Sequence, residues 1–253
     1  MRILGAVVMH INKRKAAKVL SKILLVIFFM SFGLLSSELY RTYKVKQMGK
    51  QLSEIRVISN EEKDWSKGML ELNKDYAGWL TVYGTNVDYP VVLGETNDTY
   101  LRRDFYGEWS IAGTPFFDET TDFSKDGNRI IYGHMMKDDT MFGSLDQFKD
   151  KDFFVNNGYV RLEDINGTHD YKIFAALVVA GNFDSSSYLD LQKWSNVLSK
   201  KDTEEMLKTV KERAVIYQEP LKREGDTYLF LVTCDYSRNN GRLVLVARSI
   251  QDE

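Results

Sequence analysis

The spacing of apolar residues predicts that most of this chain is built from β-strands. Short runs of β-branched and aromatic residues, such as 79–83, are separated by glycine, asparagine and other turn residues. Asn166 and Gly167 stand between two further runs, at 159–163 and 170–180. Because both residues tolerate positive φ angles, this dipeptide is a strong signal for an antiparallel hairpin.

Two segments have a helical period instead. In the first, Ser59 and the glutamate three residues later have the spacing of a capping box ahead of an apolar stripe. In the second, between residues 185 and 217, Asp202 begins another capping sequence ahead of a second stripe. The stripes consist of Trp65, Met69 and Leu72, and of Leu207, Val210 and Ala214. We therefore expect an N-terminal helix that ends near Tyr76 and a helical insertion within the β-rich body.

The most apolar strands are predicted at the end of the chain. Residues 228–234 and 242–250 form two strand-like runs, and the polar segment 235–241 joins them. In the first run both alternating faces are apolar until the last two positions, which is typical of a central strand. Its final residue, Cys234, is therefore expected where a buried strand leaves the core.

The N-terminal segment has the layout of a membrane anchor. Six basic residues and no acidic ones precede Ile23, and the run 23–35 carries no charge. Residues 19–40 reach the roughly 20 residues that span a bilayer if the side chain of Lys22 extends to the interface. Tyr40 would then lie at the opposite interface. The basic residues favour an N-terminus inside the cell and the bulk of the chain outside.

We therefore expect a single-pass protein of the cell membrane. A cleaved signal peptide and a buried helix of a soluble protein are the alternatives, although 33–37 lacks a clean small-x-small cleavage pattern. The chain is divided into a cytoplasmic basic segment (1–18), a transmembrane signal anchor (19–40), a stalk with the N-terminal helix (41–76) and a globular domain (77–253).

Composition limits the classes of protein to which the chain can belong. With 253 residues, 43% of them apolar, and a formal net charge of -2, it can bury one good-sized core. Charges of both signs are interspersed, so we expect no nucleic-acid partner. The single cysteine excludes an internal disulfide and a C-x-x-C pair. No acidic cluster stands out as a cation site, so we expect no metal.

The lone thiol of Cys234 has two interpretations. Most free cysteines are small buried side chains, but a neighbouring base or cation makes such a thiol a nucleophile. Of the three histidines, His10 falls on the cytoplasmic side of the predicted anchor and His169 falls in the predicted hairpin turn. His134 follows the strand-like run 129–132, so it too is expected at a strand end. Taken alone, a histidine of this kind is more often structural.

Arginine is a third candidate group, because its guanidinium can stabilise negative charge that develops on a carbonyl oxygen. Arg242 opens the last predicted strand, across the loop from Cys234, and antiparallel pairing would place it near the thiol. Arg238 lies within the loop, and Arg248 lies near the far end of the strand. An ordinary strand-end salt bridge is the alternative role for Arg242.

Several of these segments resemble segments of the sortase family. The nucleophile and arginine strands of sortases are similar to Leu231-Val232-Thr233-Cys234 and Gly241-Arg242-Leu243-Val244-Leu245-Val246-Ala247, and their histidine segment to Ile131-Tyr132-Gly133-His134-Met135. Further segments match in the same order, at Gly78-Trp79-Leu80, Val87-Asp88-Tyr89-Pro90-Val91-Val92, Tyr100-Leu101, Gly113-Thr114-Pro115-Phe116-Phe117-Asp118 and Met141-Phe142-Gly143-Ser144-Leu145. In the family's Thr-Leu-x-Thr-Cys motif, Phe230 replaces the first threonine, which we expect to alter packing and not chemistry.

The resemblance implies a fold. It is a mainly β, α+β architecture, a closed sortase β-barrel with an N-terminal helix and a helical insertion before the nucleophile strand. Both additions are similar to those of class B sortases. Residues 77–253 would then be a catalytic domain, preceded by the single transmembrane helix.

The resemblance also implies a reaction, with Cys234, His134 and Arg242 as the catalytic residues. The chain would cleave the C-terminal sorting signal of an exported protein at a threonine carbonyl through a thioacyl intermediate. It would then transfer the acyl group to an amine of a peptidoglycan precursor or cross-bridge, without a cofactor. Thr233, Asp235 and Tyr188 are candidate substrate contacts, the first two because they flank the thiol.

Two other classes of protein remain to be weighed against a transpeptidase. A papain-like cysteine hydrolase would place its nucleophile at a helix N-terminus early in the chain, whereas Cys234 ends a late strand. A membrane-anchored, β-rich binding or adhesion domain would need an inert Cys234 and an incidental His134. Reactivity towards a thiol alkylator distinguishes the last case, because a structural thiol is protected by burial.

Overall fold

The computed structural model of the chain describes residues 13–61, 65–196, 198–221, 223, 225–237 and 239–250. It consists of two compact units, Met1–Lys44 and Val45–Glu253, each of which is described by itself. Helix α1 (Lys13–Glu61) begins in the first unit. Within it, Ala17–Arg56 contains an apolar window of mean hydropathy 2.2, none of which is buried. This helix is long and apolar enough to cross a membrane, and the predicted anchor falls inside it.

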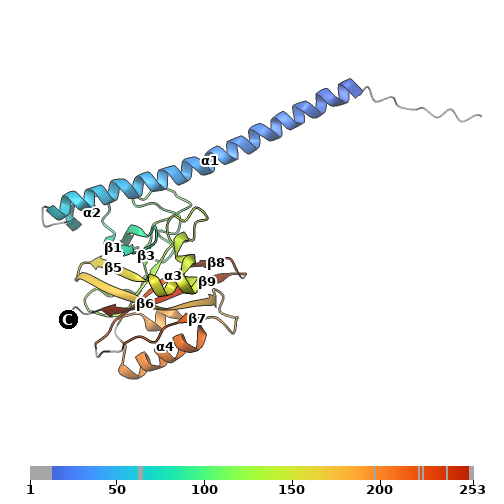
Figure 1. Cartoon of the computed structure of the whole chain (residues 1–253). Helices are drawn as coiled ribbons and strands as arrows, with labels where there is room; N and C mark the ends of the chain where they lie inside the picture. Colours follow the sequence, from blue (N-terminus) through green and yellow to red (C-terminus); the bar gives the residue numbers. More distant parts are fainter. Residues whose placement is uncertain are drawn as a thin grey trace, which may run out of the picture. The chain divides into compact units, whose positions relative to one another are not determined.

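The second unit is a closed β-barrel. Eight strands follow one another in the order β5-β1-β2-β3-β4-β8-β9-β6, and β6 pairs again with β5 to close the ring. The ninth strand, β7, adds to the edge of β6 (Figure 1). The strands are β1 (Tyr76–Val82), β2 (Asp88–Val92), β3 (Phe116–Phe117), β4 (Arg129–Tyr132), β5 (Tyr159–Asp164), β6 (Gly167–Ala180), β7 (Ala214–Tyr217), β8 (Tyr228–Asp235) and β9 (Gly241–Ile250). The predicted fold class is confirmed.

The long strand β6 is what closes the barrel. It begins at the predicted hairpin, where Gly167 adopts φ +124° and pairs with Asp164 across a two-residue turn. The first part of β6 pairs with β5, and its later part pairs with β7 at Ala175–Leu177, while β9 runs along its other edge. Strand β6 therefore pairs with both β5 and β9, and these two pairings close the ring. His169 lies within this strand and not in the turn, so its predicted position was wrong.

The central strand β8 is buried on both faces, as its sequence predicts. Leu229 and Leu231 point into the barrel, where they join the largest apolar cluster. Phe230 and Val232 point outward into a second cluster, which we call the outer cluster; its members include Ile130, Phe174, Leu177, Leu191, Met206, Leu207, Val210, Val244 and Val246. The ring of Phe230 lies 5.8 Å from that of Trp194. Phe230, which stands where the family's motif has its first threonine, therefore has a packing role.

The N-terminal helix differs from its prediction. Helix α1 continues through Ser59 to Glu61, so no helix begins at the predicted cap. A separate helix, α2 (Trp65–Leu72), carries the predicted stripe, and Tyr76 already belongs to β1. The early end has a local cause, because the Asn73 side chain donates to the Tyr100 hydroxyl at 3.0 Å and to the Phe105 carbonyl at 2.8 Å. These bonds turn the chain out of the helix.

The C-terminal part of α1 packs on the barrel within the second unit. Leu52 is fully buried in a third cluster that also contains Met69 and Trp79. Arg56 lies 2.5 Å from the Glu163 carboxylate and 4.8 Å from the centroid of the Trp79 ring. This part of the helix therefore belongs to the folded body.

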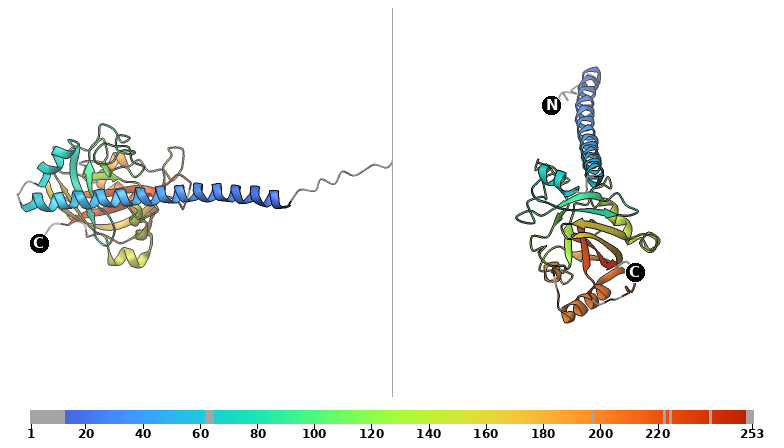
Figure 2. Two further views of the ribbon diagram at one scale, coloured as in Figure 1. Left: turned by 90° about the horizontal axis from the view of Figure 1, so that it is seen from above. Right: turned by 90° about the vertical axis from the view of Figure 1, so that its left-hand side faces the viewer.

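The insertion before β8 is helical only in part. It contains the 3-10 helix η2 (Leu191–Trp194) and helix α4 (Lys200–Arg213), which lies on the outside of the barrel in the right-hand view of Figure 2. The cap of α4 is Ser199, whose hydroxyl accepts from the Asp202 amide at 3.2 Å, one turn before the predicted cap. The remaining short elements are η1 (Gly143–Lys149) and α3 (Lys151–Asn156).

Candidate active site

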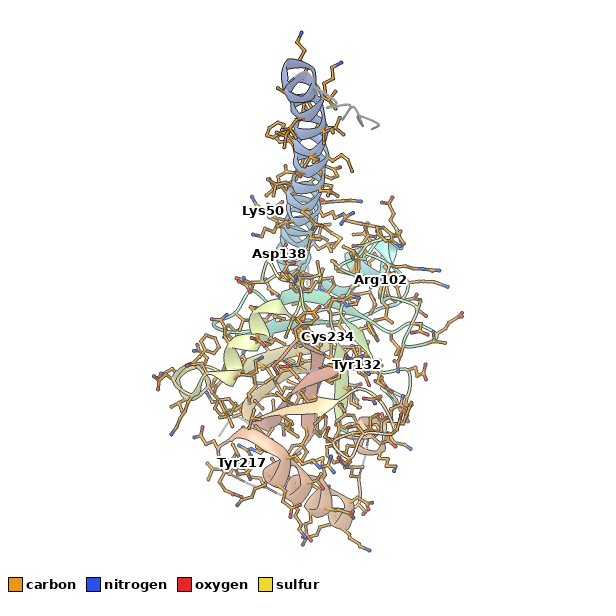
Figure 3. The ribbon with its side chains drawn as sticks, turned by 90° about the vertical axis from the view of Figure 1, so that its right-hand side faces the viewer. Lys50, Arg102, Tyr132, Asp138, Tyr217 and Cys234 are labelled. Carbon is orange, nitrogen blue, oxygen red and sulfur yellow. The ribbon has the colours of Figure 1, made fainter. Side chains whose placement is uncertain are left out.

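Two neighbouring parallel strands, β4 and β8, bring His134 and Cys234 to the same level of the barrel. The register pairs Tyr132 with Val232, and the Gly133 amide donates to the Val232 carbonyl at 3.1 Å. His134 and Cys234 each follow this pair by two residues. They therefore occupy matching positions on adjacent chains, which in a sheet run about 4.8 Å apart. Figure 3 shows Cys234 and Tyr132 close together.

The antiparallel strand β9 adds Arg242 on the other side of Cys234. The two residues are direct partners in the register of β8 and β9. The side chain of Cys234 packs at the edge of the inner cluster of the barrel. The thiol, the imidazole and the guanidinium therefore come from the ends of three adjacent strands.

His134 is half-buried and is held by a backbone carbonyl. Its Nε2 atom lies 2.7 Å from the Leu101 oxygen. A carbonyl oxygen only accepts, so Nε2 carries the proton and Nδ1 of the neutral ring remains an acceptor. Burial lowers the pKa of His134 below its ordinary value of 6.5, the Leu101 carbonyl opposes this shift, and the charges of Arg102 and Arg242 add to it. The neutral imidazole is thus favoured near pH 7.

The other two groups are also placed for chemistry. Cys234 is a free, half-buried thiol, so its sulfur is neither sealed in the core nor disulfide-bonded. Arg242 is half-buried and donates through Nη1 to the Gly241 carbonyl at 3.0 Å and to Asn240 Oδ1 at 3.3 Å. Gly181, at the end of β6, makes room for it, because a Cβ there would lie 3.0 Å from Cζ of Arg242. Its charge contributes to the lowered pKa of His134.

The two predicted substrate contacts that flank the thiol are buried. Thr233 faces the interior, and its hydroxyl has no hydrogen-bond partner among the residues that the structure describes. The Asp235 carboxylate is fully buried and lies 2.9 Å from Nζ of Lys149, at the end of η1. It also accepts from the amide and the hydroxyl of Ser237. These bonds hold the residues after Cys234 against η1.

The third predicted contact, Tyr188, lies on the insertion beside the site. It forms a parallel bridge with Ala180 at the end of β6, and its ring is 4.8 Å from the ring of Phe183. Burial raises the pKa of Tyr132 most, Asp118 adds to the shift, and so does the charge of Tyr188. Its bridge to Ala180 places Tyr188 close to Gly181, the glycine that lies against Arg242.

Sequence reasoning missed the groups that position His134. The Leu101 carbonyl is a backbone atom of a loop, and the residue type at 101 carries no sign of its role. Gly113 gives a weak signal, since glycine often marks a positive φ, here +60°. A Cβ at this glycine would lie 2.7 Å from the Tyr100 oxygen, 2.9 Å from the Leu101 oxygen and 3.2 Å from Cδ2 of His134. The loop can approach the imidazole only because position 113 has no side chain.

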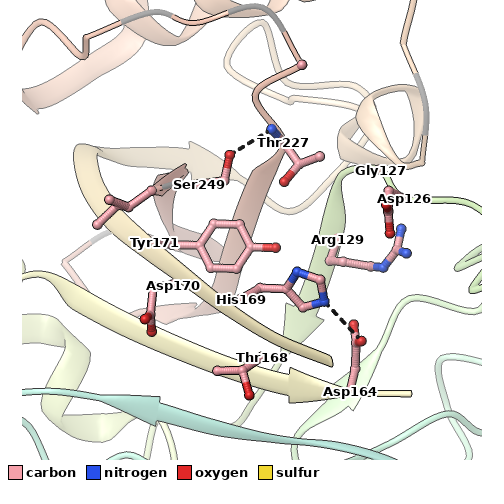
Figure 4. A pocket seen from close by; sticks show the side chains of 12 residues that line it. Asp126, Gly127, Arg129, Asp164, Thr168, His169, Asp170, Tyr171, Thr227 and Ser249 are labelled. Atoms are coloured by element: carbon pink, nitrogen blue, oxygen red, sulfur yellow. Dashed lines mark hydrogen bonds and ion pairs between the residues drawn. The ribbon is translucent and has the colours of Figure 1, made fainter. Parts of the chain in front are cut away.

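The other histidines and arginines lie elsewhere. His10 and Arg238 fall outside the described residues. Arg248 is near the far end of β9, 3.2 Å from the Asp226 carboxylate. His169 lines a polar cavity of about 340 Å³ at the opposite end of the barrel, where β4 and β8 begin, and lies 3.2 Å from the Asp164 carboxylate (Figure 4). Within the described ranges, no group of three or more metal-ligating residues comes together.

Comparisons with known proteins agree with this geometry. The family model of the Sortase domain matches residues 80–250. Sortase B of Listeria monocytogenes is 33% identical over 197 residues, which cover 76% of this chain and 77% of that protein. The X-ray structure of Clostridium perfringens Sortase B superposes with a TM-score of 0.64 at 32% identity, covering 74% of this chain and 100% of that one. A Streptococcus pyogenes class B sortase involved in pilus biogenesis has a TM-score of 0.62 at 30% identity, covering 73% and 97%.

Proposed function

This chain belongs to the sortase family, is most similar to class B sortases and is a cysteine transpeptidase, and we propose that Cys234, His134 and Arg242 are its catalytic residues. One observation carries the assignment of residues. The registers of β4 with β8 and of β8 with β9 support it, because they bring the ends of these three strands together. The family match is also the reason to set aside a papain-like hydrolase and a non-enzymatic binding domain.

We propose that the first half-reaction forms a thioester on Cys234. The thiol gives its proton to the neutral His134 imidazole while the sulfur attacks the carbonyl carbon of a threonine in a sorting signal. The tetrahedral adduct then collapses and breaks the peptide bond. His134 returns the proton to the leaving amine. The lowered pKa of His134 supports its role as the base, because the ring is unprotonated near pH 7.

The second half-reaction would reverse these roles. An amine of a peptidoglycan precursor or cross-bridge attacks the thioester and loses a proton through His134, while the thiol of Cys234 is restored. Arg242 would hold the oxygen of the reacting carbonyl in both halves. The planar fork of a guanidinium has a fixed geometry, which suits a developing oxyanion in a partly desolvated site.

The substrates would meet the enzyme at the outer surface of the cell membrane. We propose that residues 1–18 lie inside, that 19–40 form an uncleaved signal anchor, and that the stalk and N-terminal helix (41–76) carry the catalytic domain (77–253) outside. The length and hydropathy of α1 support the span. The basic residues before it support the orientation. An exported protein with a sorting signal and a wall precursor would both be reached from this position.

Replacing Cys234 with Ala tests the proposal most directly. The purified full-length chain in detergent is incubated with fluorogenic peptides that carry sorting signals and with a short peptide amine as acceptor. Turnover should fall by about a thousand-fold or more, because the nucleophile is lost. The wild-type chain should also accumulate a thioester on its single cysteine, visible by mass spectrometry. Normal turnover by a folded Cys234→Ala variant would end the proposal.

The two described histidines provide a matched pair for the base. His134→Gln should lose turnover to a similar extent, whereas His169→Gln, at the opposite end of the barrel, should keep it. Circular dichroism and thermal melting establish that each variant is folded. Equal losses of turnover in the two variants would show that His134 has no catalytic role distinct from that of His169.

A further inference from the structure

Asp118 is a carboxylate buried at the centre of a hydrogen-bond network that includes Tyr132 on β4. Its side chain is fully buried directly after β3. Four neutral side chains donate to it. They are Asn97 at 3.1 Å, Thr120 at 2.5 Å, Tyr132 at 3.0 Å and Gln192 at 3.1 Å. The Thr120 amide adds a fifth donor at 2.9 Å.

The network keeps this carboxylate ionised. Burial by itself raises the pKa of Asp118, but the hydrogen bonds from Thr120, Gln192 and Asn97 outweigh it, and the pKa lies below its ordinary value. Each donor therefore bonds to a charge, and such bonds are roughly twice as strong as those between neutral groups. A protonated or amidated side chain could not accept from all the donors at once.

Three of the donors come from three different segments of the chain, namely β4, the loop between β2 and β3, and the insertion. Tyr132 lies on β4, two residues before His134. Asn97 lies four residues before Leu101, whose carbonyl holds the imidazole. Glu119, the residue after Asp118, bonds back to Asn97 in both directions, at 2.9 and 3.0 Å.

The third segment is the insertion before β8. Gln192 belongs to η2 and follows Tyr188 by four residues. Thr120 adds a second tie to this segment, since its hydroxyl lies 3.1 Å from that of Ser195. Residues 97, 118, 132 and 192 are far apart in the sequence, so one carboxylate fixes the relative positions of the histidine strand, the loop that orients the imidazole and the insertion.

We infer that Asp118 is a positioning residue for the transpeptidase reaction, in that its ionised carboxylate sets the insertion and the His134 imidazole in one fixed arrangement. The inference rests on the proposed function of His134 and extends it. The positions of the insertion and of the His134 imidazole then depend on the same buried charge. Neutralising Asp118 should therefore affect substrate binding and the histidine together, although it touches neither Cys234 nor Arg242.

The test compares Asp118→Asn with Asp122→Asn in the full-length chain. Asp122 is a matched control, because it lies in the same loop but its carboxylate accepts only from Ser124 among the described residues, while its backbone amide donates to Asn196. Gln192→Met separates the insertion from the rest, and Tyr132→Phe removes one donor from β4. Three quantities are measured for each variant. They are the NMR titration of His134, the rate at which an alkylator modifies Cys234 as a function of pH, and KM and kcat for a sorting peptide.

Asp118→Asn should raise the pKa of His134 towards 6.5, because burial is the largest cause of its lowering and a loosened loop admits water. Loss of a negative charge alone would move that pKa downward, so the sign of the shift reports movement. We also expect kcat/KM to fall by about ten-fold or more, in both KM and kcat. Gln192→Met should raise KM alone, and Asp122→Asn should match the wild type.

The outcomes separate this inference from the proposed function. If no sorting peptide is turned over by the wild type, the proposed function fails, while the titration and the alkylation rates still measure positioning. An unchanged pKa of His134 in Asp118→Asn, or an unchanged KM in Gln192→Met, would overturn the inference. If Asp118→Asn does not fold, Tyr132→Phe decides by the same titration, since it removes only one hydroxyl.

Discussion

Arg242 and Cys234 are direct partners across β8 and β9, so their Cα atoms face each other on neighbouring strands. A guanidinium can bind a carbonyl oxygen through two parallel N–H groups, whereas an ammonium is a point charge on a flexible stem. The orientation of Arg242 is further restricted by its bonds to Gly241 and Asn240. Geometry and not charge alone should therefore decide its contribution.

Arg242→Lys is expected to lower kcat by about a hundred-fold, the usual cost of losing an oxyanion donor. Arg248→Lys is the matched control, because Arg248 lies on the same strand but pairs with Asp226 far from the site. Steady-state kinetics with a sorting peptide measure both variants. Equal kcat values for the two lysine variants would remove Arg242 from the mechanism.

The pH dependence of His134 follows from its lowered pKa. As the base, the imidazole acts in its neutral form, so kcat/KM should hold as the pH falls to 6.5 and decline only below that value. The charge of Arg242 helps to lower this pKa, so Arg242→Gln should move the NMR titration of His134 to higher pH, and Arg248→Gln should not. An unchanged pKa of His134 in Arg242→Gln would mean that the two groups are not close.

Single residues also show where sequence reasoning ends. The positions of Cys234, His134 and Arg242 follow from strand ends, which apolar runs predict well. The oxygen that orients His134 belongs to the backbone of Leu101, and no pattern of side chains predicts which carbonyl a loop presents. Likewise, Asp235 was picked for its place beside the thiol, but whether it meets substrate or Lys149 depends on how η1 packs.

At the scale of elements, the loop between β2 and β3 is shaped by its glycines. Gly113 adopts φ +60° against the Tyr100 and Leu101 oxygens and the His134 ring. Gly107, in the same loop, adopts φ +81° with open space around it. At both positions the positive φ angle would strain a residue with a side chain. Only at Gly113 would the added Cβ also collide with neighbouring atoms, among them the His134 ring.

Gly113→Ala is expected to lower kcat/KM by about ten-fold or more, because a methyl group would push the loop and the imidazole apart. Gly107→Ala should share the backbone strain, on the order of 1 kcal/mol, and keep normal kinetics. Melting curves report the strain that the two variants have in common. A normal kcat/KM for Gly113→Ala would show that the loop is not needed to hold His134.

The long elements were predictable and the short ones were not. Strands such as β8 and the Asn-Gly hairpin have strong local signals, and they were confirmed. The two-residue β3 and the strand β7 exist only because neighbours in the barrel pair with them, which no local pattern reveals. Ser199 and Asp202 both begin capping sequences, and the choice of Ser199 places Met206, Leu207 and Val210 on the outer cluster.

At the scale of the whole molecule, the boundary between the two compact units lies inside one helix. The predicted domains change at residues 40 and 76, and the second compact unit begins at Val45, within α1. Secondary structure does not mark this boundary, because helix α1 continues unbroken to Glu61. Leu52 and Arg56 mark it instead, the first through burial and the second through Glu163 and Trp79.

Two truncations test this boundary. A chain that starts at residue 45 keeps Leu52 and Arg56, so it should melt like the full-length protein, cleave a soluble sorting peptide equally well and lose its membrane association. A chain that starts at residue 62 loses both side chains and exposes Met69 and Trp79. Removing one buried leucine side chain costs about 2–5 kcal/mol, so this shorter chain should melt several degrees lower. If both truncations melt alike, the last turns of α1 belong to the stalk and not to the folded enzyme.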